Sequence, residues 1–301
     1  SGNTYIPVDK NLPEKRLEEI VKNSNAKILI NTEEDVFNFD NLIEIKSDKL
    51  SEIFEDATLE NNAKNILKSE ENVYIIYTSG STGKPKGVQI SVKNLESFLN
   101  WFTKLRFFKK NEDYIIMDQA IYSFDLSVMS IYPALFLGGT LYTLDDKSSK
   151  DMKVLSRNLE KSGINIWVST PSFAEYCFSN SNFNKEHLPK LETMFFCGEL
   201  LKKTTVGKIF QNVPEVNIIN TYGPTEATVA TTHVQIQKDM LKKEEELPVG
   251  KPDRNTELFI ERTGEIIIGG DRVSKGYYNA KEKTEKAFYV ENKKTYYKTG
   301  D

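Results

Sequence analysis

Apolar side chains recur at helical spacing after Ser91, a suitable helix-capping residue. They stand three or four positions apart and so line one face of a helix. Two other helices are expected to end at Gly138 and Gly163, because glycine readily takes the left-handed conformation that closes a helix. The predicted helices span residues 13–23, 91–105, 126–137 and 152–162.

Short runs rich in β-branched and aromatic residues lie between these helices. Strands separated by helices of about 10–15 residues are typical of crossover units. We therefore expect an α/β fold in which helices flank a largely parallel sheet. The predicted strands span residues 26–30, 42–45, 73–78, 114–117, 140–144, 164–169, 193–196 and 216–220.

The pattern changes after about residue 250. Two β-rich runs, 256–260 and 265–268, flank the sequence Glu-Arg-Thr-Gly, which predicts a hairpin. We expect residues 1–250 to form the α/β portion of the fold and residues 251–301 to form an antiparallel β subdomain.

Composition excludes several classes of protein. The 301 residues are 39% hydrophobic and 28% charged, which indicates a globular chain rather than a disordered one. Asp and Glu (44) outnumber Lys and Arg (40), so we expect no nucleic-acid partner. No apolar run approaches the ~20 residues of a membrane span. Two cysteines and two histidines argue against a disulfide scaffold and against zinc, and favour a reducing, cytoplasmic compartment.

An eleven-residue stretch that begins at Tyr77, YTSGSTGKPKG, has the clearest chemistry. Its glycines let backbone N–H groups converge on an anion, while its hydroxyls and lysines add donors and positive charge. An ordinary turn is the alternative, and the stretch departs from the P-loop because only two residues separate Gly80 from Gly83. The residues predicted to hold phosphate are Thr78, Ser79, Gly80, Ser81, Thr82, Gly83 and Lys84.

A second stretch, NTYGPTE over residues 220–226, combines groups that suit a nucleotide. The ring of Tyr222 offers a flat face for a base, and the amide of Asn220 can donate to and accept from a purine edge. The hydroxyl of Thr225 can donate to a phosphate oxygen. Glu226 is a hard oxygen ligand of the kind that Mg²⁺ takes together with substrate phosphates. A tight turn after a strand is the alternative for the Tyr-Gly-Pro segment.

These two stretches, followed by YKTGD at residues 297–301, resemble three motifs of the adenylate-forming (AMP-binding) enzyme superfamily in the family's order. The resemblance implies that ATP and Mg²⁺ are used, with Thr225 and Glu226 acting at the phosphates and Glu226 holding the metal. It places Asp301 at the ribose. The other residues that it assigns to the nucleotide are Gly198, Glu199, Asn220, Thr221 and Tyr222.

Asp125 stands among apolar residues at the start of a predicted helix, where the simplest reading is a helix cap. The stretches FDLSVM, STPSFAE, FFCGE and NTYGPTEATVA resemble the family's D-alanine–D-alanyl carrier protein ligases, which serve teichoic acid D-alanylation in the cell wall. That resemblance implies that Asp125 binds the α-ammonium of an amino acid. It places Met129, Cys197, Gly223 and Val229 around the substrate.

The resemblance also implies a partner and a further segment. The partner is a D-alanyl carrier protein, whose phosphopantetheine thiol, rather than Cys197, accepts the amino acid. The family's C-terminal lid, with its bridging lysine, lies beyond residue 301 and the N-terminal portion is also incomplete, so we expect these residues alone to adenylate poorly. Two other functions stay open: a peptide-synthetase adenylation domain for another amino acid, and a non-catalytic nucleotide-binding module.

Overall fold

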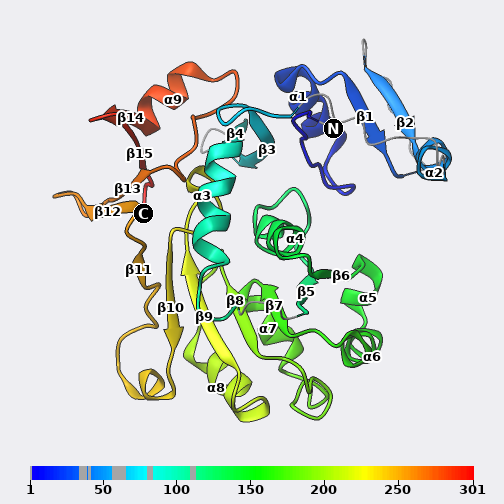
Figure 1. Cartoon of the computed structure of the whole chain (residues 1–301), viewed down its shortest axis with the longest axis vertical. Helices are drawn as coiled ribbons and strands as arrows, with labels where there is room; N and C mark the ends of the chain where they lie inside the picture. Colours follow the sequence, from blue (N-terminus) through cyan, green and yellow to red (C-terminus); the bar gives the residue numbers. More distant parts are fainter. Residues whose placement is uncertain (1, 34–38, 40–41, 56–65, 80–83, 109–112) are drawn as a thin grey trace.

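A computed structural model describes residues 2–33, 39, 42–55, 66–79, 84–108 and 113–301. The largest sheet among these residues has seven strands in the order β11-β10-β9-β8-β7-β5-β6 (Figure 1). Its strands are β5 (Ile115–Asp118), β6 (Thr140–Thr143), β7 (Ile166–Ser169), β8 (Thr193–Phe196), β9 (Asn217–Tyr222), β10 (Thr232–Ile236) and β11 (Lys251–Pro252).

Five neighbouring strands of this sheet, from β6 to β9, run parallel, which confirms the expected α/β class. β10 and β11 are antiparallel additions at one edge. The two central strands β7 and β8 are buried along their whole length, as expected for parallel strands covered on both faces. The associated helices are α3 (Val92–Phe102), α4 (Leu126–Leu137), α5 (Asp146–Lys150), α6 (Met152–Ser162), α7 (Pro171–Cys177) and α8 (Lys203–Asn212).

The helix boundaries follow the local chemistry of the sequence. The Ser91 hydroxyl accepts a hydrogen bond from the backbone N–H of Asn94, and the Asn94 side-chain oxygen accepts one from the backbone N–H of Ser91. This capping box satisfies two otherwise free N–H groups at the start of α3. α4 ends at Gly138 and α6 at Gly163, with φ of 68° and 66°. These two ends confirm the predicted glycine stops.

Alternate residues of the central strands supply two apolar cores on opposite faces of the sheet. Phe195 and Val168 belong to one core, while Met194, Phe196 and Trp167 belong to the other. This division follows from the two-residue period of a strand. Each such side chain contributes roughly 1.5–3 kcal/mol on burial, so both layers of helices are held firmly to the sheet.

Three smaller sheets accompany the large one (Figure 1). β3 (Asn72–Ser79) and β4 (Pro85–Ser91) form an antiparallel hairpin. β12 (Thr256–Ile260), β13 (Ile266–Gly270), β14 (Phe288–Glu291) and β15 (Lys294–Lys298) form an antiparallel sheet in the order β12-β13-β15-β14. β1 (Ile28–Asn31) and β2 (Ile43–Lys46) pair in parallel near α1 (Glu14–Ser24) and α2 (Ser47–Glu55). The remaining elements are η1 (Thr225–Ala227), η2 (Lys238–Lys242) and α9 (Lys281–Ala287).

The hairpin β12–β13 confirms the antiparallel structure expected near the C-terminus. The sequence prediction missed β4, β10, β11, β14 and β15, and also α2, α5, α7, α8 and α9. Among the described residues, the structure contains no helix with the length and apolar character that crossing a membrane requires.

The parallel strands bring several motifs to one edge of the sheet. β5 ends at Asp118, β8 is followed directly by Cys197, and β9 ends at Tyr222. Ligands of open α/β sheets bind at the carboxyl ends of the strands. This edge is therefore the place to examine for a site.

Candidate functional site

The predicted phosphate loop connects the two strands of the β3–β4 hairpin. Thr78 and Ser79 end β3, and they pair with Lys86 and Pro85 at the start of β4. The hairpin therefore brings both ends of the loop side by side. Four residues that were expected to hold phosphate lie outside the described part of the chain: Gly80, Ser81, Thr82 and Gly83.

Lys86 links this hairpin to the second motif. Its ammonium lies 4.0 Å from the carboxylate of Glu226, which is 7% exposed. It also donates to the hydroxyl of Tyr277 at 3.1 Å and lies 4.5 Å from the centre of that ring. Tyr277 in turn donates to Oε1 of Glu226 at 2.8 Å. The two motifs, far apart in sequence, thus meet at one carboxylate.

Glu226 is a suitable but solitary metal ligand. Within the described residues, no group of three or more His, Cys, Asp or Glu side chains gathers to enclose a metal. A single hard carboxylate fits Mg²⁺, which commonly takes one or two carboxylates and completes its shell with phosphate and water oxygens. The donor set therefore suits a metal that arrives with a nucleotide.

Asp125 is buried at the start of α4 and does not act as a cap. Its side chain makes no capping hydrogen bond, so the helix-cap interpretation is wrong. Its Oδ2 has no hydrogen-bond partner in the described structure, and burial raises the pKa of the carboxyl to about 7. The nearby Thr225 hydroxyl opposes that rise, and Glu226 adds to it. Since a buried carboxylate without a partner is costly, the position suits a cationic ligand.

Cys197 and Val229 lie together beside this carboxylate. The thiol of Cys197 donates to the carbonyl oxygen of Val229 at 3.5 Å, and both residues belong to the same apolar cluster as Met129. Burial raises the pKa of Cys197 to about 12, and Asp125 adds to the rise. The thiol is therefore neutral near pH 7, which is unsuitable for a nucleophile.

Two glycines bring the backbone close around this region. A Cβ on Gly223 would lie 2.6 Å from Cα of Ala230, so any side chain there would displace the backbone. Gly198 has a φ of 90° and would place a Cβ 3.0 Å from the ring of Phe124. Both positions therefore require glycine.

The polar side chains of β9 are already engaged in hydrogen bonds. Asn220 donates to the carbonyl of Pro248 at 2.8 Å, and Thr221 donates to the carbonyl of Phe196 at 2.7 Å. The Thr221 hydroxyl thus ties β9 to β8. Tyr222 donates to Oδ2 of Asp301 at 2.5 Å, which joins the second motif to the third.

Glu199 fixes the segment that follows β8. Its carboxylate accepts from the backbone N–H and from the hydroxyl of Ser172, both at 2.9 Å. Ser172 lies in the first turn of α7, so the stretches STPSFAE and FFCGE meet at this pair. The sequence reasoning assigned no role to Ser172 and overlooked Tyr277, since neither has a local signal that connects it to a distant carboxylate.

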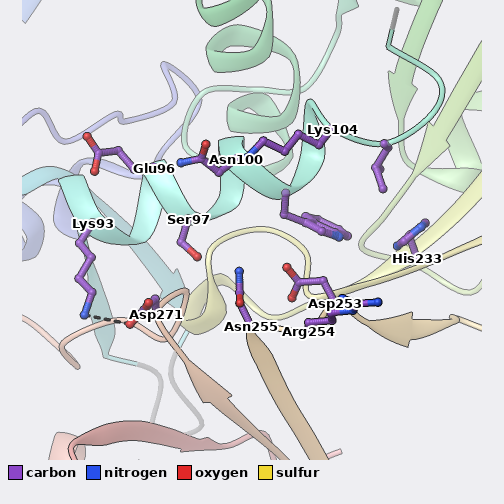
Figure 2. A pocket seen from close by; sticks show the side chains of 12 residues that line it. Lys93, Glu96, Ser97, Asn100, Lys104, His233, Asp253, Arg254, Asn255 and Asp271 are labelled. Carbon is purple, nitrogen blue, oxygen red and sulfur yellow. Dashed lines mark ion pairs between the residues drawn. The ribbon is translucent and has the colours of Figure 1, made fainter.

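A cavity of about 650 Å³ lies elsewhere, between α3 and the turn that precedes β12 (Figure 2). Lys93 and Glu96 of α3 and Lys104, just after it, lie on one side, and Asp253 and His233 lie on the other. None of the residues predicted for nucleotide or substrate lines it. The candidate site is therefore the cluster at the strand ends, not this cavity.

Known proteins resemble the chain over its whole length. D-alanine--D-alanyl carrier protein ligases from Listeria monocytogenes and Bacillus licheniformis are 40% and 41% identical over 322 and 312 aligned positions. Each alignment covers 100% of this chain, and the chain spans 61% of the length of these relatives.

Solved structures share the fold. The Vibrio cholerae adenylation domain AlmE, in complex with glycyl-adenosine-5′-phosphate, matches with a TM-score of 0.85 and 23% identity, over 100% of this chain and 63% of its own. The N-terminal subdomain of Klebsiella oxytoca NpsA, in complex with 3-hydroxybenzoyl-AMSN, matches with a TM-score of 0.81 and 23% identity, over 99% of this chain and 76% of its own. A family model described as AMP-binding enzyme matches residues 1–278. The chain belongs to the AMP-binding enzyme family.

Proposed function

We propose that the protein containing this chain activates D-alanine with ATP to form D-alanyl-AMP. In the cytoplasm the phosphopantetheine thiol of a D-alanyl carrier protein then attacks the carbonyl carbon of D-alanyl-AMP, the bond to the AMP phosphate oxygen breaks, and AMP leaves, for teichoic acid D-alanylation. The relatives named D-alanine--D-alanyl carrier protein ligase support this substrate and this partner. The observation that carries the proposal is the buried carboxylate of Asp125, whose Oδ2 has no hydrogen-bond partner in the described structure and which offers a countercharge to the α-ammonium of an amino acid.

In this reaction the chain positions the amino acid and ATP and stabilises the charge on the phosphates. A carboxylate oxygen of D-alanine attacks the α-phosphorus of ATP, the bond to the β-phosphate oxygen breaks, and pyrophosphate leaves. Bound Mg²⁺ supplies neutralisation of phosphate charge, and Glu226 is the residue that would hold it. Thr225 donates to the phosphate oxygens, while Lys84 and the hydroxyl-rich loop around it stabilise the departing pyrophosphate.

The nucleotide is held by residues of three motifs. The ring of Tyr222 lies against adenine, with Gly198 and Glu199 on the opposite side. The Asp301 carboxylate binds the ribose hydroxyls. These hydroxyls replace the Tyr222 hydroxyl, which donates a hydrogen bond to Asp301 in the structure. The amide of Asn220 keeps its oxygen and a second N–H for the purine edge beside its bond to Pro248, while Thr221, whose hydroxyl donates to Phe196, holds β9 against β8.

The amino acid side chain is selected by size. Met129, Cys197 and Val229 form an apolar wall beside Asp125, and Gly223 lets the backbone approach. A wall of this kind favours a methyl group and excludes larger side chains by clash. We also keep as a proposal that residues 1–250 supply this pocket, and that residues 251–301 form a smaller subdomain which contributes Asp301.

The deciding experiment is ATP–pyrophosphate exchange with a panel of amino acids. Because the chain spans 61% of its relatives, the assay uses it within a protein of their full length. Exchange that depends on D-alanine, and is weaker with glycine, L-alanine and D-valine, supports the proposal. Exchange that prefers another amino acid indicates a peptide-synthetase type of adenylation domain, and ATP binding without any exchange indicates a non-catalytic module.

A further inference from the structure

Two consecutive residues after the second motif, Thr228 and Val229, have left-handed backbones. Their φ angles are 56° and 68°. This conformation is costly for β-branched residues, on the order of 1–3 kcal/mol for each residue. Since neither is glycine, the surrounding structure must hold the turn in place. Val229 is also the residue whose carbonyl accepts from Cys197, so the turn determines where the wall of the candidate pocket lies.

Residues that follow β13 make three hydrogen bonds with the segment that contains this turn. The hydroxyl of Thr228 donates to the carbonyl oxygen of Arg272 at 2.6 Å, and both groups are buried. The N–H of Ser274 donates to the carbonyl of Glu226 at 2.8 Å. The guanidinium of Arg272 donates to the carbonyl of Ala230 at 3.4 Å. The contacts flank Val229 on both sides along the chain.

Arg272 is itself fixed by its neighbours, so its carbonyl is a rigid acceptor. The guanidinium is 2% exposed and lies 4.4 Å from the centre of the Trp101 ring. It pairs with Asp253 and donates to the hydroxyl of Thr256. Trp101 of α3 and Asp253 also line the cavity described above. The antiparallel sheet and α3 thus anchor a turn that contributes Val229 to the proposed substrate pocket.

We propose that Thr228 is a positioning residue for substrate selection. Its hydroxyl, bonded to the Arg272 carbonyl, keeps Val229 at a fixed depth in the pocket wall and so sets the largest side chain that the pocket accepts. A pocket excludes a larger substrate side chain by steric clash only if its wall is rigid. If the turn could be displaced, the larger side chain would fit at little cost. The inference rests on the proposed amino acid activation and deepens it.

The test measures, by calorimetry, binding of two non-hydrolysable adenylate analogues to a protein of the relatives' full length that contains this chain, because the chain spans 61% of those relatives. One is D-alanyl sulfamoyl-adenosine, and the other carries D-valine instead. Thr228→Ser keeps the hydroxyl and is the matched control. Thr228→Ala and Thr228→Gly both remove it, and glycine is the residue for which a positive φ has the least cost. The thermal midpoint of each variant is measured alongside.

We expect wild type and Thr228→Ser to favour the D-alanyl analogue by the same factor, within about twofold. In Thr228→Ala and Thr228→Gly this preference falls about tenfold, which is the range that one or two carbons contribute in a pocket. A lower thermal midpoint with an unchanged preference means that the role of Thr228 is only structural, and it overturns the inference. The inference is also overturned if the wild type binds both analogues with equal affinity. If wild type binds neither analogue, the proposed function itself fails, and this inference fails with it.

Discussion

The hydroxyl of Tyr222 donates a hydrogen bond of 2.5 Å to Oδ2 of Asp301, across 79 residues of sequence. Tyr222 ends β9 in the large sheet, whereas Asp301 follows the antiparallel sheet after β15. The bond therefore joins the large sheet to the segment that follows the antiparallel sheet, at the edge where the motifs meet. It also places the proposed base-binding ring next to the proposed ribose-binding carboxylate.

Asp301→Ala is expected to weaken AMP binding about tenfold or more, because hydrogen bonds to a charged group contribute roughly 1.5–3 kcal/mol. Calorimetry with a protein of the relatives' full length measures the change. The matched ligand is 2′,3′-dideoxy-AMP, which lacks both hydroxyls and should bind wild type and variant alike. An equal loss for both ligands would contradict a role at the ribose.

Helices and strands with strong local signals were predictable. The helices over residues 126–137 and 152–162 have the predicted bounds, because a terminal glycine ends each of them and the second also has a periodic apolar face. β4 was not predictable, since its sequence PKGVQIS opens with proline and contains glycine. It exists because it pairs along its length with β3, and that pairing is tertiary information.

The candidate site was predictable in its residues but not in its connections. Motif resemblance identified Glu226 and Asp125, yet no local pattern indicates that Tyr277 donates to Glu226 from 51 residues away. Nor does a pattern indicate that Asp125 leaves its helix uncapped. Both facts follow from packing between the antiparallel sheet, the hairpin and the large sheet.

The raised pKa of Asp125 predicts a particular dependence of stability on pH. Its folded value of about 7 exceeds the unfolded value of roughly 4, so the folded state binds the extra proton between these two pH values. Ionisation of this group thus destabilises the fold progressively as the pH rises from about 4 to about 7, by up to on the order of 4 kcal/mol.

Asp125→Asn removes this ionisation. The free energy of unfolding of the variant, minus that of wild type, should increase from pH 5 to pH 7 and stay level above. Urea denaturation at each pH measures both proteins. A difference that does not change with pH would show that the carboxyl titrates at an ordinary value.

The same variant separates amino acid recognition from nucleotide binding. Asn has nearly the shape of Asp but carries no charge, so Asp125→Asn should weaken the D-alanyl sulfamoyl-adenosine complex about 30-fold or more, as expected for loss of a buried countercharge. AMP, which lacks the ammonium, should bind within twofold of wild type. If wild type and Asp125→Asn bind the analogue with equal affinity, Asp125 does not bind the ammonium of the amino acid.

Tyr277→Phe tests how Glu226 is oriented. The variant keeps the ring beneath Lys86 but loses the 2.8 Å bond to the Glu226 carboxylate. Partners of this kind commonly contribute 10–100-fold to metal affinity, so the Mg²⁺ concentration for half-maximal ATP binding should rise about tenfold. Tyr289→Phe, whose ring stacks on Tyr296, is the matched control. If both variants need the same Mg²⁺ as wild type, Tyr277 does not orient the ligand.

Gly223→Ala should destabilise the fold and distort the pocket together. The new Cβ would lie 2.6 Å from Cα of Ala230 and 2.8 Å from the nitrogen of Thr231, and these backbone atoms cannot rotate away. Overpacking of this kind costs typically about 1–3 kcal/mol.

Gly207 provides the control for this change. It lies within α8 with nothing inside 4 Å of the added carbon, so Gly207→Ala should stabilise the chain by up to about 1 kcal/mol through helix propensity. Urea denaturation gives both values, and calorimetry with D-alanyl sulfamoyl-adenosine reports on the pocket. Because Gly223 precedes the turn that carries Val229, its variant should lose affinity for the analogue, while Gly207→Ala retains it. If the Gly223→Ala protein is as stable as wild type, the backbone at Ala230 moves to accommodate the new Cβ at little cost. The proposed pocket wall is then not rigid at this position.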